Sequence, residues 1–103
     1  MKIFISQPMR GKTGTQILAE RKEAQDHLRE MYGEGVEFIE SYMDDDPVGK
    51  NEALYKLGRS LELMAGADLV YFMKGWEDAR GCKIENECAI AYGITVQEDY
   101  REG

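Results

Sequence analysis

The chain has 103 residues, of which 43% are hydrophobic and 32% are charged. That length provides one modest hydrophobic core, so we expect a single domain spanning residues 1–103. A formal net charge of -7 excludes proteins that wrap long nucleic-acid backbones, because neutralising phosphates requires clustered lysine and arginine.

The apolar stretches are far too short to cross a bilayer, and no secretory signal precedes the first of them. We therefore expect a cytoplasmic protein that does not associate with membranes. Cys82 and Cys88 lie six residues apart, without a CxxC motif or a cluster of histidines. Both thiols are expected to be reduced, and no metal site is expected.

Signals for strands and helices alternate along the first half of the chain. Residues 2–5 are apolar and β-prone, and they predict a strand that ends in the loop 6–13. Residues 15–32 carry apolar side chains at helical spacing opposite a charged face, which predicts an amphipathic helix. Residues 36–39 predict a second strand, followed by an acidic loop over 40–49. The apolar positions of the first helix are Ile17, Leu18, Ala24, Leu28 and Met31.

The second half continues the alternation. Residues 51–65 predict a second helix, and residues 69–73 are a continuous apolar run, typical of a central parallel strand covered on both faces. A third helix opens at Gly81 and ends at Gly93, and residues 94–96 predict a last strand. The side chains expected in the core are Leu54, Leu57, Leu61 and Met64 in the second helix and Ile84, Cys88 and Ala91 in the third.

This order of elements predicts an α/β fold. We expect a three-layer, flavodoxin- or Rossmann-like parallel sheet of four to five strands flanked by helices. In such sheets, ligands bind beyond the carboxyl ends of the strands, where the strand order reverses. Three segments should meet there, namely residues 6–13, 41–47 and 74–85.

The first of these segments joins a strand to a helix, where free backbone N–H groups and the helix dipole favour an anion. Arg10 can add a bidentate contact and Ser6 a hydroxyl. The pattern supports a phosphate site and an ordinary loop equally. A Walker-type NTPase is not expected, because Ser6 stands at the first glycine position and Pro8 removes a donor. The match of residues 13–15 to a flavin loop is too short to predict a cofactor.

Glu85 is the residue most suited to catalysis. Glu85 and Glu87 point roughly 200° apart on a helix, so only one of them can face a ligand. Glu85 lies next to expected core positions and near the helix start, where the dipole favours its ionised form. An ionised, partly shielded carboxylate can attack an anomeric carbon through an oxocarbenium-like transition state. On chemistry alone, a glutamate that only complements the helix dipole is the commoner explanation.

Four further features have both a functional and a structural interpretation. Trp76 can stack on a base or anchor its loop, and Tyr42 can bond a sugar or pack with its hydroxyl in water. The acids at residues 44–46 suit either a cation site or a solvated loop. His27 lies in the first helix beside charged residues, and a surface position is expected.

A motif around the candidate nucleophile carries a family resemblance. Gly81 is followed after three residues by Glu85, and Ala89 comes four residues later. Residues 38–42, with their acidic continuation, and residues 67–71 add related segments. Together these features resemble the nucleoside 2-deoxyribosyltransferase superfamily, and within it a group of small bacterial and phage proteins, over nearly the whole chain.

The resemblance implies cleavage of an N-glycosidic bond, or transfer of its base. Glu85 would attack C1′ of a nucleoside or a nucleoside 5′-monophosphate, and the glycosyl-enzyme would pass to water or a second base. No cofactor is implied, and a homodimer or larger oligomer is expected, with pockets completed by a neighbouring subunit. A non-catalytic nucleotide-sensing module is the alternative. The expected substrate-binding residues are Ser6, Gln7, Met9, Arg10, Gly11, Tyr42, Trp76 and Gly81.

Two positions depart from the family pattern. The family usually carries an aspartate eight residues before the acid that opens the central strand; here that acid is Asp68 and the position is Ser60. A serine hydroxyl does not ionise near neutral pH, so it cannot shuttle a proton as a carboxylate does. The glycine common two residues after the nucleophile is Glu87. The general acid is thus left open between Asp44, Asp78 and a partner chain.

Overall fold

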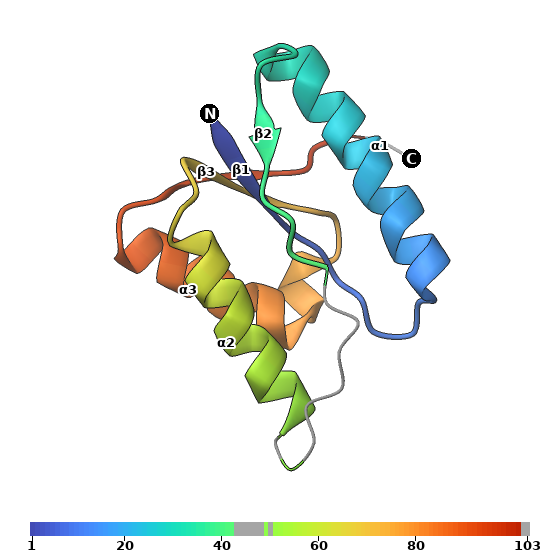
Figure 1. Ribbon diagram of the computed structural model, residues 1–103, viewed down its shortest axis with the longest axis vertical. Helices are drawn as coiled ribbons and strands as arrows, with labels where there is room; N and C mark the ends of the chain where they lie inside the picture. The colour runs from blue at the N-terminus through green and yellow to red at the C-terminus, as the bar shows by residue number, and fades with distance from the viewer. Residues whose placement is uncertain (43–48, 50, 102–103) are drawn as a thin grey trace.

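The computed structural model describes residues 1–42, 49 and 51–101, which build a four-stranded parallel sheet (Figure 1). The strand order is β2-β1-β3-β4. The bounds are Lys2–Ser6 for β1, Glu37–Phe38 for β2, Leu69–Phe72 for β3 and Thr95–Glu98 for β4. The order reverses between β1 and β3, the place where flavodoxin-like sheets bind ligands. The predicted α/β fold with a parallel sheet is therefore confirmed.

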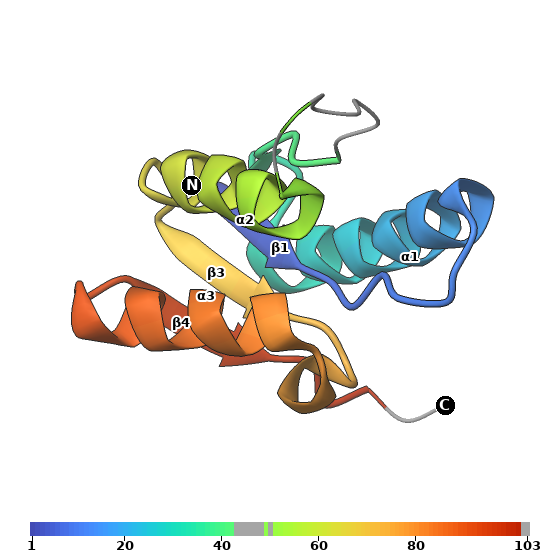
Figure 2. The same ribbon diagram turned by 90° about the horizontal axis from the view of Figure 1, so that it is seen from below.

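Helices cover both faces of the sheet and make three layers (Figure 2). α1, Gly14–Tyr32, packs on one face, whereas α2, Glu52–Met64, and α3, Arg80–Ala91, pack on the other. The single-turn 3-10 helix η1, Trp76–Asp78, leads into α3. Within the described part of the chain, every helix is too short or too polar to cross a lipid bilayer.

Local sequence signals set the helix boundaries. The Thr13 hydroxyl accepts a hydrogen bond from the N–H of Gln16 at 3.1 Å, and the Gln16 side chain accepts one from the N–H of Thr13 at 2.8 Å. Gly33 ends α1 with a φ of 96°, a conformation that strains residues with a Cβ atom. Asn51 caps α2 by accepting from the N–H of Leu54 at 2.9 Å. The boundaries of α1 and α2 lie within one residue of those predicted.

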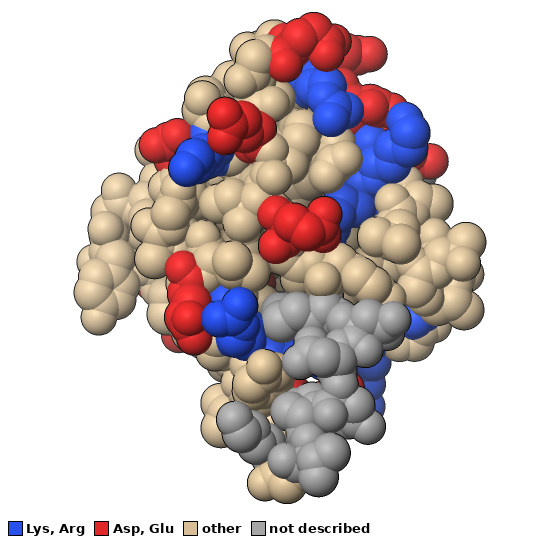
Figure 3. Space-filling model, in the orientation of Figure 1, with Lys and Arg blue, Asp and Glu red and all other residues tan. Residues whose placement is uncertain are grey.

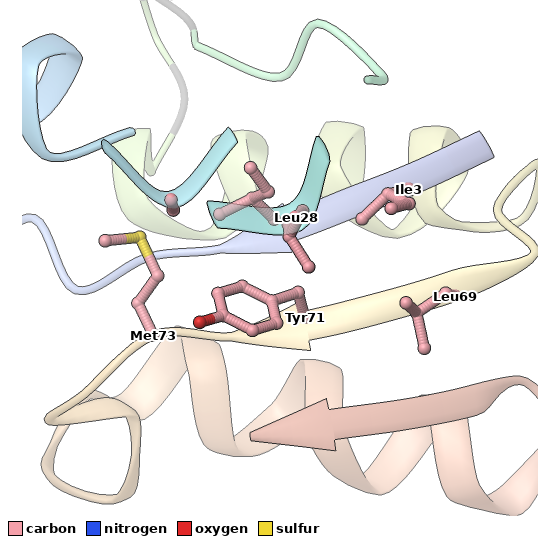
Figure 4. Close-up of a cluster of buried hydrophobic side chains, with 7 residues drawn as sticks. Ile3, Leu28, Leu69, Tyr71 and Met73 are labelled. Atoms are coloured by element: carbon pink, nitrogen blue, oxygen red, sulfur yellow. The ribbon is translucent and has the colours of Figure 1, made fainter. Parts of the chain in front are cut away.

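The core has two parts, because successive side chains of a strand point to opposite faces. Ile3 and Tyr71 face α1, and Figure 4 shows Leu28 of that helix pointing toward them. His27, expected at the surface, is half-buried, with its ring centroid 6.4 Å from that of Tyr71. The opposite face carries a second cluster that contains Phe4, Met64, Val70, Phe72 and Ala89. The run over residues 69–73 is thus buried on both faces, as its lack of alternation predicted.

The beginning of α2 lies outside the core, contrary to the prediction from helical spacing. Leu54 is 66% exposed, Leu57 and Leu61 are half-buried, and Met64 alone of the predicted set is fully buried. The reason is geometric: the 13-residue helix is about 20 Å long, whereas the four residues of β3 extend about 13 Å. The first turns of α2 therefore extend past the sheet (Figure 1).

The buried sides of α1 and α3 also differ from the predicted ones. Leu18 and Met31 are each 48% exposed, Ala91 is exposed, and Ile84 and Cys88 are half-buried. The prediction was wrong because it selected apolar residues alone, and each helix places a charged residue in its buried stripe. The buried residues are Ile17, Arg21, Ala24 and Leu28 in α1 and Cys82, Glu85 and Ala89 in α3.

Two leucines of α1 provide a matched test of this packing. Leu28→Ala is expected to lower the free energy of unfolding by about 2–5 kcal/mol, because the side chain is fully buried. Leu18→Ala removes the same atoms from a largely exposed position and should change it by less than about 0.5 kcal/mol. Urea denaturation measures both values, and equal losses would contradict the orientation of α1.

Candidate functional site

Glu85 lies at the carboxyl edge of the sheet with its side chain turned inward. It comes from the second turn of α3 and is only 7% exposed. The hydroxyl of Ser6, the last residue of β1, donates a hydrogen bond to Glu85 Oε1 at 2.7 Å. The segments that follow β1 and β3 therefore meet, as the parallel-sheet argument predicted. The carboxylate is shielded from bulk water.

Burial raises the pKa of Glu85 above its ordinary value, because an ionised carboxylate loses its hydration. Three neighbours act in the opposite direction: the hydroxyl of Ser6, the guanidinium of Arg21 and the hydroxyl of Ser60. The expectation from the helix dipole omitted this desolvation, which is the larger effect. The carboxylate thus combines weak hydration with a small set of groups that stabilise its charge.

Arg21 is a site residue that the sequence reasoning missed. It belongs to α1, is 6% exposed, and donates from Nε to Gln7 Oε1 at 3.0 Å. Neither Nη1 nor Nη2 has a hydrogen-bond partner among the described residues. The carboxylates of Glu40 and Glu85 act electrostatically on the guanidinium and favour its charged form. A signal was available, since Arg21 continues the apolar stripe of α1 at the spacing i+4 from Ile17.

Ser6 and Gln7 were predicted to bind substrate, and both are buried and bonded to protein groups. Ser6 donates to Glu85, while Gln7 Nε2 donates to the carbonyl of Ile17 at 2.8 Å. Gln7 also accepts from Arg21 and so fixes the position of that guanidinium. Both residues therefore orient the charged side chains of the site.

The other predicted members of this loop are exposed. Met9, Arg10 and Gly11 lie on the surface, where the carbonyl of Met9 accepts from the N–H of Lys12 at 3.1 Å. Gly11 adopts a φ of 78°, which favours glycine at this turn. The side chain of Arg10 makes no hydrogen bond or ion pair with the described residues.

Tyr42 and Trp76, the two aromatic residues predicted to bind substrate, both contact protein groups. Tyr42 is half-buried, and its hydroxyl lies against Gly14, where an added Cβ atom would be 2.8 Å away. Trp76 donates from Nε1 to Glu98 Oε1 at 3.0 Å and packs on Phe72 with ring centroids 5.2 Å apart. These contacts favour the interpretation of Trp76 as an anchor for its loop.

The remaining predicted residues are less informative. Gly81 in the first turn of α3 has open space where a Cβ atom would be. Of the candidate acids, Asp78 is exposed in η1, and Asp44 lies outside the described residues, as do the other acids of 44–46. Among the described residues, no group of three or more His, Cys, Asp or Glu side chains is arranged to hold a metal ion.

Described residues line two cavities. One of about 460 Å³ lies along the outer side of α2, where Leu54, Tyr55 and Arg59 line it. The other, of about 160 Å³, lies at the carboxyl edge of the sheet, where Gln7 and Arg101 are among its lining residues. The face drawn in Figure 3 carries acidic and basic side chains interspersed, without one continuous basic surface.

Comparison with known proteins gives a family match without an activity. A family model described as a domain of unknown function, DUF4406, matches residues 1–98. No curated protein matches the chain. The resemblance to nucleoside 2-deoxyribosyltransferases therefore stays a prediction.

The raised pKa of Glu85 predicts a pH-dependent effect on stability. A carboxylate whose pKa is higher in the folded state contributes most to stability below its ordinary value of 4.5, and that contribution is lost as the pH rises through the folded value. Glu85→Gln imitates the protonated form, so we expect a higher melting temperature than wild type at neutral pH. The difference should vanish in acid.

Thermal unfolding across this pH range measures the effect. Glu87→Gln is the matched control, because Glu87 is exposed on the same helix. A destabilised Glu85→Gln at neutral pH would show that the charged form of Glu85 is the favoured one in the fold.

Proposed function

The chain belongs to the DUF4406 family, a domain of unknown function, and from the geometry of its site we propose an N-glycosidic activity. The enzyme cleaves the N-glycosidic bond of a nucleoside or nucleoside 5′-monophosphate, or transfers its base, with Glu85 as nucleophile. One observation carries this proposal: a shielded carboxylate, held by Ser6, at the edge where parallel sheets bind ligands.

The chemistry proceeds in two displacements at C1′. An oxygen of Glu85 forms a bond to C1′ as the bond from C1′ to the base nitrogen breaks, and the electron pair leaves with the base. The departing base takes up a proton from water or from an enzyme group. Water or a nitrogen of a second base then attacks C1′, the bond to Glu85 breaks, and the attacking group loses a proton. This sequence needs no cofactor.

The neighbours of Glu85 support the role of a nucleophile. Ser6 holds Oε1 and so fixes the orientation of the carboxylate. Desolvation makes the ionised carboxylate more reactive, while Ser6, Ser60 and Arg21 keep the ionised form accessible. A positively charged group beside the carboxylate also limits its protonation when substrate excludes water.

A nucleotide-sensing module is the second candidate, and the environment of Glu85 supplies the observation that favours it. The carboxylate accepts a hydrogen bond from the hydroxyl of Ser6, and the hydroxyl of Ser60 also favours its ionised form. Neither hydroxyl releases a proton readily near neutral pH. A site that lacks an acid for the departing base would bind a nucleotide without cleaving it.

We extend the proposal to the biological setting. The substrate is a small molecule in the cytoplasm, and the protein acts as a homodimer or larger homo-oligomer without binding polymeric nucleic acid or membranes. Large apolar side chains left exposed on the single chain support self-association, among them Leu54 at 66% and Ile90 at 61%.

The activity test compares two glutamates of one helix. Wild type is expected to release free base from deoxynucleosides or their 5′-monophosphates, and Glu85→Gln should lower kcat by roughly a thousandfold or more. Glu87→Gln should leave kcat unchanged, because Glu87 is exposed. Chromatography of the products, with and without an acceptor base, measures hydrolysis and transfer.

Full activity of Glu85→Gln would exclude Glu85 as the nucleophile. Thermal stabilisation by nucleotide without turnover in wild type would identify the sensing module instead.

The pH profile provides a second test, on Ser6. The hydrogen bond from Ser6 lowers the pKa of Glu85, so Ser6→Ala should raise it. Since the reaction needs ionised Glu85, the acid limb of kcat/KM against pH should move to higher pH in Ser6→Ala. An unmoved acid limb would show that another group controls the reaction.

The association state is tested by sedimentation velocity. The expected mass is at least twice the 11.8 kDa of one chain. A sedimenting species of 11.8 kDa at micromolar concentration would contradict the oligomer.

A further inference from the structure

Arg21 is a buried cation whose two outer nitrogens have no hydrogen-bond partner in the part of the chain that the structure describes. The side chain is 6% exposed, and only Nε is bonded, to Gln7 Oε1 at 3.0 Å. Nη1 and Nη2 are buried without a hydrogen-bond acceptor among the described residues. An arginine remains charged in proteins, and a buried charge without acceptors opposes folding. Such a group is typical of a site that a ligand completes.

The surroundings place this guanidinium beside the proposed nucleophile. It lies where α1 meets the segment after β2, with the carboxylate of Glu40 close enough to act on its charge. Glu85 of α3 also acts on it electrostatically, but Oε1 of that carboxylate is bonded to Ser6. The cation and the carboxylate therefore lie close together at the carboxyl edge of the sheet without a direct bond.

Gln7 fixes the orientation of the Arg21 guanidinium, including Nη1 and Nη2. Gln7 Nε2 donates to the carbonyl of Ile17, one turn before Arg21 on α1, and Gln7 Oε1 accepts from Arg21. The guanidinium plane is thus tied to its own helix through the side chain of Gln7, the residue that follows β1. The four N–H groups on Nη1 and Nη2 remain as an oriented fork, which matches paired oxygen atoms.

We infer that Nη1 and Nη2 of Arg21 bind the 5′-phosphate of a nucleoside monophosphate whose sugar faces Glu85. This inference rests on the proposed function and names its substrate class. In a nucleoside monophosphate, C1′ and the phosphate are separated by the sugar, so a phosphate-binding group should lie near the nucleophile without touching it. Arg21 interacts electrostatically with Glu85, while its hydrogen bond goes to Gln7.

The sequence offered Arg10 as one possible phosphate contact, and the contacts in the structure favour Arg21. Arg10 is exposed, so water and salt screen its attraction for an anion. Ser6, the other expected donor, gives its hydroxyl to Glu85, and the Thr13 hydroxyl caps α1. A buried guanidinium interacts with a phosphate more strongly, because little water lies around it.

The experiment measures binding in the Glu85→Gln background, where turnover does not interfere. Calorimetry compares a deoxynucleoside 5′-monophosphate with the same deoxynucleoside. Adding Arg21→Met should weaken binding of the monophosphate by roughly 10- to 100-fold, as expected for lost charge-assisted hydrogen bonds. Binding of the nucleoside should change by less than about twofold. Arg10→Met, which changes an exposed arginine, is the matched control and should weaken binding of the monophosphate much less.

Folding of the variant is itself a readout. Because Nη1 and Nη2 are without acceptors, Arg21→Met should unfold at the same temperature as its parent or at a higher one. If the methionine variant does not fold, Arg21→Lys keeps the charge and removes the fork. Arg21→Lys should still weaken binding of the monophosphate more than binding of the nucleoside.

The possible results separate this inference from the proposed function. Equal weakening of nucleoside and monophosphate would place the sugar on Arg21 and overturn the phosphate assignment, as would no weakening of either. Phosphate-selective loss with no base release by wild type would support the inference while excluding the enzyme. If neither ligand binds before Arg21 is changed, the proposed function and the inference both fail.

Discussion

The buried hydrogen bond between Ser6 and Glu85 is the interaction on which the site depends. It joins the end of β1 to α3 across 79 positions of sequence at 2.7 Å. Ser6 is itself positioned by the central ladder, where it is paired with Phe72 of β3. A carboxylate at this depth is tolerated only if hydrogen bonds replace its lost hydration. The packing of α3 on the sheet and the ionisation of Glu85 are therefore coupled.

Two opposite charges share this region without neutralising one another. Glu85 accepts a hydrogen bond from Ser6, and Arg21 donates one to Gln7, so each charged group is held by a neutral partner. Burial raises the pKa of Glu85 and lowers the pKa of Arg21, which shows that desolvation outweighs their mutual attraction. A fold selected for stability alone would pair these charges or replace them with apolar side chains. Their separation is typical of a site in which part of the stability is given up for function.

Ser60 departs from the family pattern in residue type but still acts on Glu85. The resemblance would place an aspartate there, and the structure places the Ser60 hydroxyl where it stabilises ionised Glu85. A second carboxylate so close would raise the pKa of Glu85 further, because like charges oppose ionisation. With serine at this position, a hydroxyl group in place of a second carboxylate acts on Glu85. The proposed enzyme would need an acid for the departing base, whereas the proposed sensor, which does not cleave its ligand, would not.

Sequence alone determined the order of elements and most of their boundaries. The continuous apolar run over residues 69–73 and the end of the first helix near Gly33 are local signals, and they predict structure without knowledge of neighbours. The location of Glu85 could also be predicted from the sequence, because a residue near a helix start in a β-to-α segment lies at the carboxyl edge of the sheet.

Tertiary structure decided which side chains lie inside. Leu54 is exposed because α2 extends past the sheet, and Trp76 is anchored because Glu98 of β4 lies within hydrogen-bonding distance. Arg21 was hidden for the same reason: helical spacing shows which residues share a face, but not how far that face is covered. That coverage depends on the lengths and positions of elements distant in sequence, so the buried cation beside Glu85 emerged only when α1, β1 and α3 were brought together.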